Sequence, residues 1–291
     1  EGGVKLCFIA SNSVHAVKWI RYFAENGHDI LWLAVCRQEE VSEMYGVKIH
    51  CLGQLEMRNW TRFLSSAWRA RRLVRSWKPD LLHAHYAGVN GLLGLFAGYH
   101  PFVVTAWGSD VLLAGKAFFT RFLVRTILRH ADIITCDAEH MCRAISSLGA
   151  DSGKLHKIMF GIDTELFRPP AAELPLGPQS NPVVVSLRSL EPLYDVQTLI
   201  KAVPMVLRSV PSACFKIVGS GSQEQELKSL AVRLGVQDKI SFLGRIPNQE
   251  LPEFLRGCDV YVSTSLSDAG IASSTAEAMS CGLPVVVSDS G

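Results

Sequence analysis

Short runs of apolar and β-branched residues alternate with stretches of helical period along the whole chain, and this alternation limits the fold more than any other feature. Strands separated by helices are typical of parallel sheets, because a parallel connection needs a crossover that a helix supplies. The strands predicted from these runs are 5–10, 30–35, 81–83, 102–105 and 133–136, then 183–187, 215–218, 240–243, 260–263 and 284–287. The sequence therefore predicts an α/β fold with two doubly wound parallel sheets of five strands each.

A change of composition separates the two sets of strands. Residues 171–182 are rich in Pro, Gly and Ser, which is typical of a domain boundary. We expect an N-terminal domain over 1–165, a linker over 166–182 and a C-terminal domain over 183–291. All 9 histidines lie in the first part, so any imidazole chemistry belongs to the N-terminal domain. No closing helix follows the last predicted strand, which predicts an incomplete second domain in a truncated chain.

The composition excludes several classes of protein. Hydrophobic residues make up 48% and charged residues 19% of the chain, which excludes intrinsic disorder. The run 91–104 is too short and too interrupted to cross a bilayer, and no signal peptide precedes the first strand, so a cytoplasmic location is expected. The 8 cysteines form no Cys-x-x-Cys pair and are expected as buried thiols.

Residues 57–78 combine a helical apolar stripe with an excess of positive charge. The stripe predicts an amphipathic helix. The segment contains no anion, and its cations are Arg58, Arg62, Arg69, Arg71, Arg72, Arg75 and Lys78. These cations form either a solvated face or a surface that binds an anionic membrane leaflet, at about 1 kcal/mol per cation. Nucleic acid is disfavoured as a partner because no recognition motif accompanies them.

The segment around Ser274 and Glu277 carries two compatible interpretations. Their spacing is that of a capping box, and the glycine and proline that follow predict the end of a short helix. The N–H groups at the start of this helix follow Gly270, and together they form an anion site suited to a diphosphate.

Arg188 directly follows a predicted strand, at the end where open α/β sheets bind ligands. A guanidinium there can chelate phosphate oxygens, and a solvated arginine fits the same pattern. Gly219 and Gly221 lack the third glycine of a dinucleotide fingerprint, which disfavours a nicotinamide dehydrogenase. No P-loop, hydrolase elbow or Asp-x-Asp pair occurs, and His83 and His85 lack a nearby third ligand, so neither a cofactor nor a metal is expected.

Six segments occur in an order that is itself informative. They are 20–28, 78–85 (KPDLLHAH), 105–110 (TAWGSD), 160–169 (FGIDTELFRP), 242–247 (FLGRIP) and the segment around Glu277. Each is weak alone, but as an ordered set they resemble the family-4 glycosyltransferases, retaining sugar-nucleotide enzymes of the GT-B fold. The resemblance covers nearly the whole chain. It implies two Rossmann-like domains that face each other across a cleft, with the donor held mostly by the second.

The resemblance also implies roles for residues at matching positions. Arg188 would bind the diphosphate, Glu277 the ribose hydroxyls, and Asp110 would lie over the transferred sugar, so these three are the candidate catalytic residues. The further implied donor-binding residues are Tyr194, Gly219, Gly221, Arg245, Ile246, Asp268, Gly270, Ile271, Ala272 and Ser273. The implied acceptor-side residues are His15, His85 and Trp107. Each of these histidines would either orient or deprotonate the acceptor, or serve as a structural residue.

Three positions depart from the family pattern. Tyr194 replaces a lysine that usually follows the arginine. Ala269 stands where the first glutamate of the Glu-x7-Glu pattern falls, with Asp268 as the nearest substitute, and Trp107 replaces a loop histidine. The identity of the sugar and the turnover therefore stay open.

The expected function is retaining transfer of a hexose from a UDP- or GDP-sugar to a glycan or lipid-linked acceptor. Arg188 and the helix N–H groups would stabilise the leaving diphosphate electrostatically. The expected location is the cytoplasm, peripherally on the inner face of the membrane where segment 57–78 would bind. The alternative is a catalytically silent module that binds a sugar nucleotide or a partner, and a third reading is a sugar-nucleotide epimerase.

Overall fold

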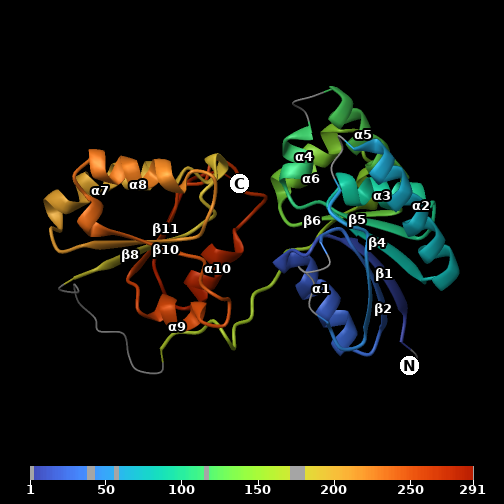
Figure 1. Ribbon diagram of the computed structural model, residues 1–291, viewed down its shortest axis with the longest axis horizontal. Coiled ribbons are helices and arrows are strands. Elements are labelled where there is room, and N and C mark those ends of the chain that lie inside the picture. Colours follow the sequence, from blue (N-terminus) through green and yellow to red (C-terminus); the bar gives the residue numbers. More distant parts are fainter. Residues whose placement is uncertain (1–2, 38–42, 56–58, 115–117, 171–180, 291) are drawn as a thin grey trace. The chain divides into compact units, whose positions relative to one another are not determined.

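The computed structural model describes residues 3–37, 43–55, 59–114, 118–170 and 181–290. The chain forms two compact units, Glu1–Met159 and Phe160–Gly291 (Figure 1). Each unit contains one parallel sheet with helices around it, which confirms the predicted α/β fold with two parallel sheets.

The sheet of the first unit has the strand order β3-β2-β1-β4-β5-β6-β7. Its strands are β1 Lys5–Ala10, β2 Asp29–Ala34, β3 Val47–Cys51, β4 Leu81–His85, β5 Phe102–Thr105, β6 Ile133–Cys136 and β7 Leu155–Lys157. The helices of this unit are α1 Val14–Glu25, α2 Trp60–Trp77, α3 Val89–Ala97, α4 Ser109–Leu112, α5 Phe118–His130 and α6 Glu139–Ser147. The chain steps outward from β1 to β3 on one side and from β4 to β7 on the other, so the order reverses between β1 and β4.

Two strands of this sheet, β3 and β7, differ from the expectation of five. Both are edge strands. Half-buried and exposed residues alternate along β3, and β7 has only 3 residues, two of them exposed. A strand of a parallel sheet reads as a continuous apolar run when it is buried on both faces, and an edge strand loses that run. For this reason the five central strands were predicted from the sequence, and the two edge strands were not.

Helix α2 confirms the amphipathic helix that was predicted over 57–78, although Met57 and Arg58 lie outside the described residues. Asn59 caps the helix, because its side chain accepts the N–H of Arg62 at 3.1 Å. Phe63, Ala67, Ala70 and Val74 form the buried stripe. Among the helices in the described part of the chain, none is long and apolar enough to cross a membrane.

The sheet of the second unit has the order β10-β9-β8-β11-β12. Its strands are β8 Val183–Leu187, β9 Cys214–Val218, β10 Ile240–Gly244, β11 Val260–Ser263 and β12 Val285–Val287, and its helices are α7 Val196–Ser209, α8 Glu224–Arg233, α9 Leu251–Arg256 and α10 Ser273–Ser280. Helices α7 and α8 pack on one face of the sheet and α9 and α10 on the other (Figure 1). Here the order reverses between β8 and β11.

Residues 160–170 belong to the second unit. Phe167 is buried in its core, and Oγ of Ser280 donates a hydrogen bond to the Phe167 carbonyl oxygen at 2.5 Å. The division between the compact units thus falls at residue 159, ahead of the predicted boundary at 165, while most of the predicted linker 166–182 lies outside the described residues.

Candidate functional site

Many of the candidate residues lie where the strand order of a sheet reverses. In the second unit this point lies between β8 and β11, which pair directly. Open α/β sheets bind ligands at such points, outside the carboxyl ends of the strands. Arg188 follows β8 at this edge, and the loop with Asp268 follows β11 there. The second unit therefore brings the predicted diphosphate arginine and the Asp268 loop together.

Arg188 is buried and is held by two side chains. Its Nη2 forms an ion pair with Oδ1 of Asp268. Its guanidinium carbon lies 4.4 Å from the centre of the Tyr194 ring, which is a cation–π distance. Tyr194 belongs to the short helix η4 Pro192–Tyr194, next along the chain from β8. Within the described part of the chain, Nε of Arg188 has no hydrogen-bond partner. The guanidinium is thus fixed in place, and its Nε donor is unused within the described residues.

Gly219 and Gly221 hold the loop after β9 against the loop that carries Arg188. A Cβ on Gly219 would lie 2.1 Å from the backbone oxygen of Arg188, and one on Gly221 would lie 2.3 Å from that of Leu190. Leu190 in turn donates its N–H to the carbonyl oxygen of Ser220 at 3.0 Å. Side chains do not fit at either glycine, so the two glycines set the backbone position of Arg188.

Helix α10 corrects the predicted capping box. The helix begins at Ser273 with Ala272 as its N-cap, two residues before the predicted N-cap Ser274, and no side chain among the described residues caps it. Oγ of Ser274 instead lies 2.8 Å from the hydroxyl of Tyr261. That hydroxyl belongs to a buried tyrosine of β11 and needs a polar partner, which Ser274 supplies. Glu277 is buried within the helix, so capping does not explain it.

The other predicted donor-binding residues lie in loops after β10 and β11. Residues 270–273 form the entry to α10, where Ile271 is exposed and Oγ of Ser273 is buried with no hydrogen-bond partner among the described residues. Arg245 is exposed and donates from Nε to Oγ of Ser220 at 2.9 Å. Ile246 packs against the core beside α9 and α10.

The acceptor-side residues gather where the order reverses in the first unit. His15 of α1 stacks on Trp107 with ring centres 4.7 Å apart, and Trp107 lies over His85 at 5.8 Å. Nε1 of Trp107 donates to Nδ1 of His85 at 3.3 Å. The structure thus brings the three predicted residues together next to β1 and β4.

His83 and His85 are neutral because they are buried. Desolvation lowers the pKa of His85 well below its ordinary range, and the nearby imidazoles of His83 and His15 lower it further. Burial lowers the pKa of His83 to about 3. Since Nδ1 of His85 accepts from Trp107, the assigned tautomer carries its proton on Nε2, which has no partner among the described residues. His85 is therefore suited to donating a hydrogen bond and is a weak general base.

Asp110 points inward and ties two loops together. Its carboxylate accepts the N–H groups of Ala87 at 2.6 Å, Trp107 at 3.1 Å and Gly108 at 2.9 Å. Burial raises the pKa of Asp110 to about 6, against the lowering effect of these amides. Asp110 thus joins the loops after β4 and β5 and fixes the backbone of Trp107. Its predicted place over the transferred sugar stays a prediction.

Helices α2 and α5 carry exposed aromatic and basic side chains, of which only the cations on α2 were predicted from the sequence. Trp60 and Trp68 of α2 are exposed, and so are Phe118, Phe119 and Phe122 of α5. The rings of Trp60 and Phe119 lie 6.5 Å apart, so exposed aromatic residues of the two helices meet at this point. We call these five residues, together with the exposed arginines of α2, the aromatic-basic surface. The exposed arginines of α2 are Arg62, Arg69, Arg72 and Arg75. Three phenylalanines flanking Arg121 were the signal that reveals its second half.

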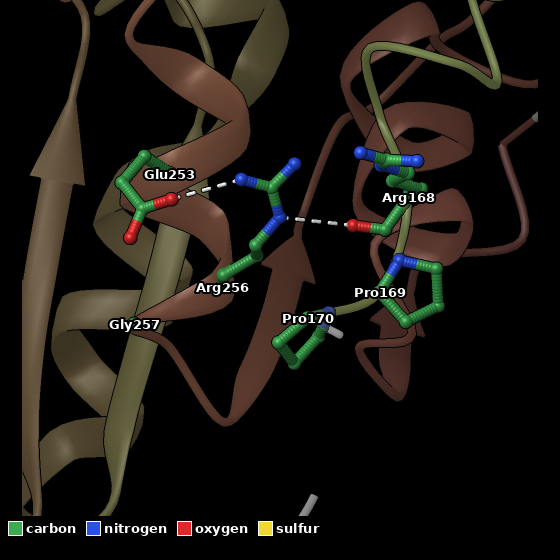
Figure 2. Close-up of a pocket in the computed structure, with 6 residues that line it drawn as sticks. All are labelled: Arg168, Pro169, Pro170, Glu253, Arg256 and Gly257. Carbon is green, nitrogen blue, oxygen red and sulfur yellow. Dashed lines mark hydrogen bonds and ion pairs between the residues drawn. The ribbon is translucent and has the colours of Figure 1, made fainter. Parts of the chain in front are cut away.

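Two further features bear on the predictions. No group of three or more His, Cys, Asp or Glu side chains in the described ranges is placed to hold a metal ion. A pocket of about 540 Å³ lies at the opposite edge of the second sheet, and Figure 2 shows Arg256 there between Glu253 and the carbonyl oxygen of Arg168. The residues that line it are Arg168, Pro169, Pro170, Glu253, Arg256 and Gly257, and none of them was a predicted site residue.

Several proteins of known sequence resemble this chain. The GDP-mannose-dependent alpha-(1-6)-phosphatidylinositol monomannoside mannosyltransferase of Mycolicibacterium smegmatis is 32% identical over 241 residues, which cover 77% of this chain and 62% of that protein. The protein of the same name from Mycobacterium tuberculosis is 30% identical over 59% of this chain and 47% of its own length. The chain therefore spans from about half to somewhat under two thirds of these relatives.

Solved structures show which fold the chain has, and family profiles show its family. Anabaena HepE, in complex with UDP and glucose, superimposes with a TM-score of 0.80 at 18% identity over 99% of this chain and 81% of its own. Sucrose-phosphate synthase from Thermosynechococcus elongatus gives 0.82 at 15% identity, over 98% and 81%. The GT-B fold is confirmed. The profile "Glycosyl transferase 4-like" matches residues 5–138 and "Glycosyl transferases group 1" matches residues 175–291, and the chain belongs to this family of glycosyltransferases.

Proposed function

We propose that the protein transfers a hexose, with retention of configuration, from a nucleotide diphosphate sugar to a glycan or lipid-linked acceptor. The observation that carries this proposal is the guanidinium of Arg188, which is buried at the reversal point of the second sheet and whose Nε has no hydrogen-bond partner among the residues described. A fixed guanidinium with a spare donor suits the oxyanions of a leaving diphosphate. The buried Ser273 hydroxyl and the buried Glu277 carboxylate on α10 add polar groups for phosphate and ribose.

Catalysis on this proposal is electrostatic. The departing diphosphate gains negative charge, and Arg188 with the N–H groups at the start of α10 presents positive charge that is already oriented before the reaction. Removing one donor of this kind costs about 2.7–4 kcal/mol of transition-state stabilisation. These groups carry the charge in the proposal, so it invokes no divalent metal.

The relatives support the donor class. The mycobacterial proteins are named for GDP-mannose, and the HepE structure contains UDP and glucose. Both UDP- and GDP-sugars therefore remain within the proposal, with Arg245 and Ile246 after β10 as the candidates for contact with the base.

Substitution of Arg188 tests the donor site. Arg188→Ala should weaken binding of UDP or GDP far more than binding of uridine or guanosine, because the guanidinium is assigned to the phosphates. Calorimetry with the four ligands measures this difference. Equal losses for nucleotide and nucleoside would refute the assignment.

Turnover separates the proposed enzyme from its alternatives. Release of UDP or GDP from a panel of sugar nucleotides, with and without a lipid or glycan acceptor, is expected to depend on the acceptor. Binding without release would identify a silent module, and a free epimer of the sugar would identify an epimerase.

The aromatic-basic surface supports a lipid-linked acceptor at an anionic membrane. Arginines supply charge attraction and exposed tryptophan and phenylalanine rings suit the interfacial region of a bilayer. Arg71 does not take part, because its Nη1 donates to the carbonyl oxygens of Phe96 and Ala97 at 3.0 and 3.1 Å and closes the end of α3. The exposed arginines on α2 are Arg62, Arg69, Arg72 and Arg75.

Co-sedimentation with vesicles of phosphatidylglycerol and phosphatidylcholine tests this surface. Replacing Arg69, Arg72 and Arg75 by Gln should remove about 3 kcal/mol of attraction, roughly a hundredfold in binding. Phe122→Ser should weaken vesicle binding as much at high salt as at low salt, because the ring contributes apolar contact and not charge. Wild-type protein that never sediments would point instead to a soluble glycan acceptor.

A further inference from the structure

We propose that Asp268 is an internal competitor for the donor: its carboxylate occupies a position on Arg188 that a phosphate oxygen takes, and it leaves when the diphosphate binds. This inference rests on the proposed function, since it concerns the same guanidinium. It reverses the expected effect of Asp268, from helping the donor to opposing it.

Asp268 occupies only part of the edge that the Arg188 guanidinium offers. The Nε and Nη2 hydrogens of an arginine point the same way and form one edge that holds two oxygens side by side. In this structure Asp268 holds Nη2, while Nε of the same edge has no partner among the described residues. The carboxylate therefore uses half of the edge. A phosphate group that binds both donors satisfies the edge completely, but only after Asp268 has released Nη2.

Tyr194 and Asp268 restrict access to the Arg188 guanidinium. The Tyr194 ring lies over the guanidinium, so a ligand must approach by the edge and not by that face. The side chain of Arg188 is 7% exposed and that of Asp268 is 21% exposed. An anion arriving from solvent therefore meets the Asp268 carboxylate before it meets the arginine.

The charges of Arg188 and Asp268 balance in the free protein. Tyr194 stands where the family usually has a lysine, so Arg188 is the cation that the resemblance leaves for the diphosphate. The ion pair with Asp268 neutralises that cation in the free protein. Removing one partner of a buried ion pair leaves an uncompensated charge, which costs stability. An anionic ligand that restores the pairing regains this free energy, so loss of the Asp268 charge should favour the diphosphate.

Asp268→Asn removes the negative charge that competes for Arg188, while asparagine keeps the shape of the side chain and one acceptor oxygen. Isothermal calorimetry with inorganic pyrophosphate, UDP and GDP should show affinity about tenfold higher than in the wild type, equivalent to about 1.4 kcal/mol. Affinity for uridine and guanosine should not change. The thermal midpoint of the free variant should fall, and pyrophosphate should raise it by more than it raises that of the wild type.

Asp289→Asn is the matched control. Asp289 is exposed and lies just after β12, next to Ser290, whose carbonyl oxygen accepts the N–H of Asp268 at 3.1 Å. Its substitution removes the same formal charge near the Asp268 loop but leaves the Asp268 carboxylate in place. Its affinity for pyrophosphate should equal that of the wild type. A rise in Asp289→Asn as large as that in Asp268→Asn would show a long-range charge effect and would overturn the proposal.

The proposal and the proposed function fail in different ways. If Arg188→Ala loses pyrophosphate binding while Asp268→Asn binds it no better than the wild type, competition is refuted and the donor site stands. If neither the wild type nor Asp268→Asn binds pyrophosphate or distinguishes UDP from uridine, both fail. Should Asp268→Asn not fold, the side-chain carboxyl ¹³C signal of Asp268 in the wild type decides: it should shift on addition of UDP and not of uridine, and an unmoved signal overturns the proposal.

Discussion

Acidification should destabilise the first unit, because its sheet contains imidazoles that are buried in the neutral form. Burial lowers the pKa of His83 to about 3, against 6.5 for an ordinary histidine. The unfolded chain therefore binds a proton at a pH where the folded chain does not. The resulting stabilisation is complete above about pH 6.5 and is lost progressively as the pH falls below it.

The size of the effect follows from that difference. A pH of about 5 lies roughly 1.5 units below the pKa of the histidine in the unfolded chain. At about 1.36 kcal/mol per pH unit, the contribution of His83 to the free energy of unfolding falls by about 2 kcal/mol. His85 acts in the same direction, since burial lowers its pKa as well. Asp110 acts in the opposite direction. Its pKa is raised from 3.8 to about 6, so its contribution to the free energy of unfolding increases as the pH falls below about 6. Asp110 offsets about 1.4 kcal/mol at pH 5, and the two histidines still outweigh it.

Urea unfolding followed by tryptophan fluorescence at about pH 7.5 and about pH 5 measures this loss. In His83→Gln, whose amide reaches toward Thr105 as Nε2 of the imidazole does at 2.7 Å, the loss on acidification should shrink by about 2 kcal/mol. His156→Gln, at an exposed position of β7, should behave as the wild type. An unchanged loss in His83→Gln, or wild-type stability that rises on acidification, would refute the reasoning.

Three further substitutions probe the loops of the two units. Glu277→Gln should weaken UDP or GDP binding about tenfold in calorimetry, because two charged acceptors are replaced by one neutral acceptor. Gly219→Ala should cost about 1–3 kcal/mol in urea unfolding and weaken pyrophosphate binding, whereas Gly257→Ala, with its nearest contact at 3.6 Å, should do neither. Asp110→Asn should cost about 1.5–3 kcal/mol, because its amide nitrogen faces a backbone N–H such as that of Ala87.

The position of Arg188 was predictable from the sequence, while its partners were not. Strand register places the residue after an apolar run at the carboxyl edge of a parallel sheet, and that rule needs only local sequence. The contact with Asp268 joins residues 80 positions apart and depends on how the loop after β11 folds. The stacking of Tyr194 on Arg188 likewise depends on η4, a turn whose pattern carries no periodic signal.

Helix α10 shows how a correct local motif gives a wrong contact. The spacing of Ser274 and Glu277 fits a capping box, and in an isolated peptide nothing would compete for the serine hydroxyl. In the folded unit Tyr261 brings a buried hydroxyl within 2.8 Å of the Ser274 hydroxyl, and the helix starts two residues earlier than the capping box predicts. Tertiary burial of one tyrosine thus decides the N-terminus of a helix, and the sequence pattern holds no trace of it.

The two units solve one physical problem in different ways. Each must hold two neighbouring loops at a fixed separation beside the point where its strand order reverses, because predicted ligand residues stand on those loops. In the first unit the buried carboxylate of Asp110 draws the loops after β4 and β5 together through backbone N–H groups. In the second unit Gly219 and Gly221 allow the loops to touch by having no side chain. Asp110 therefore acts on Trp107, and the glycines on Arg188, by setting the backbone from which those side chains project.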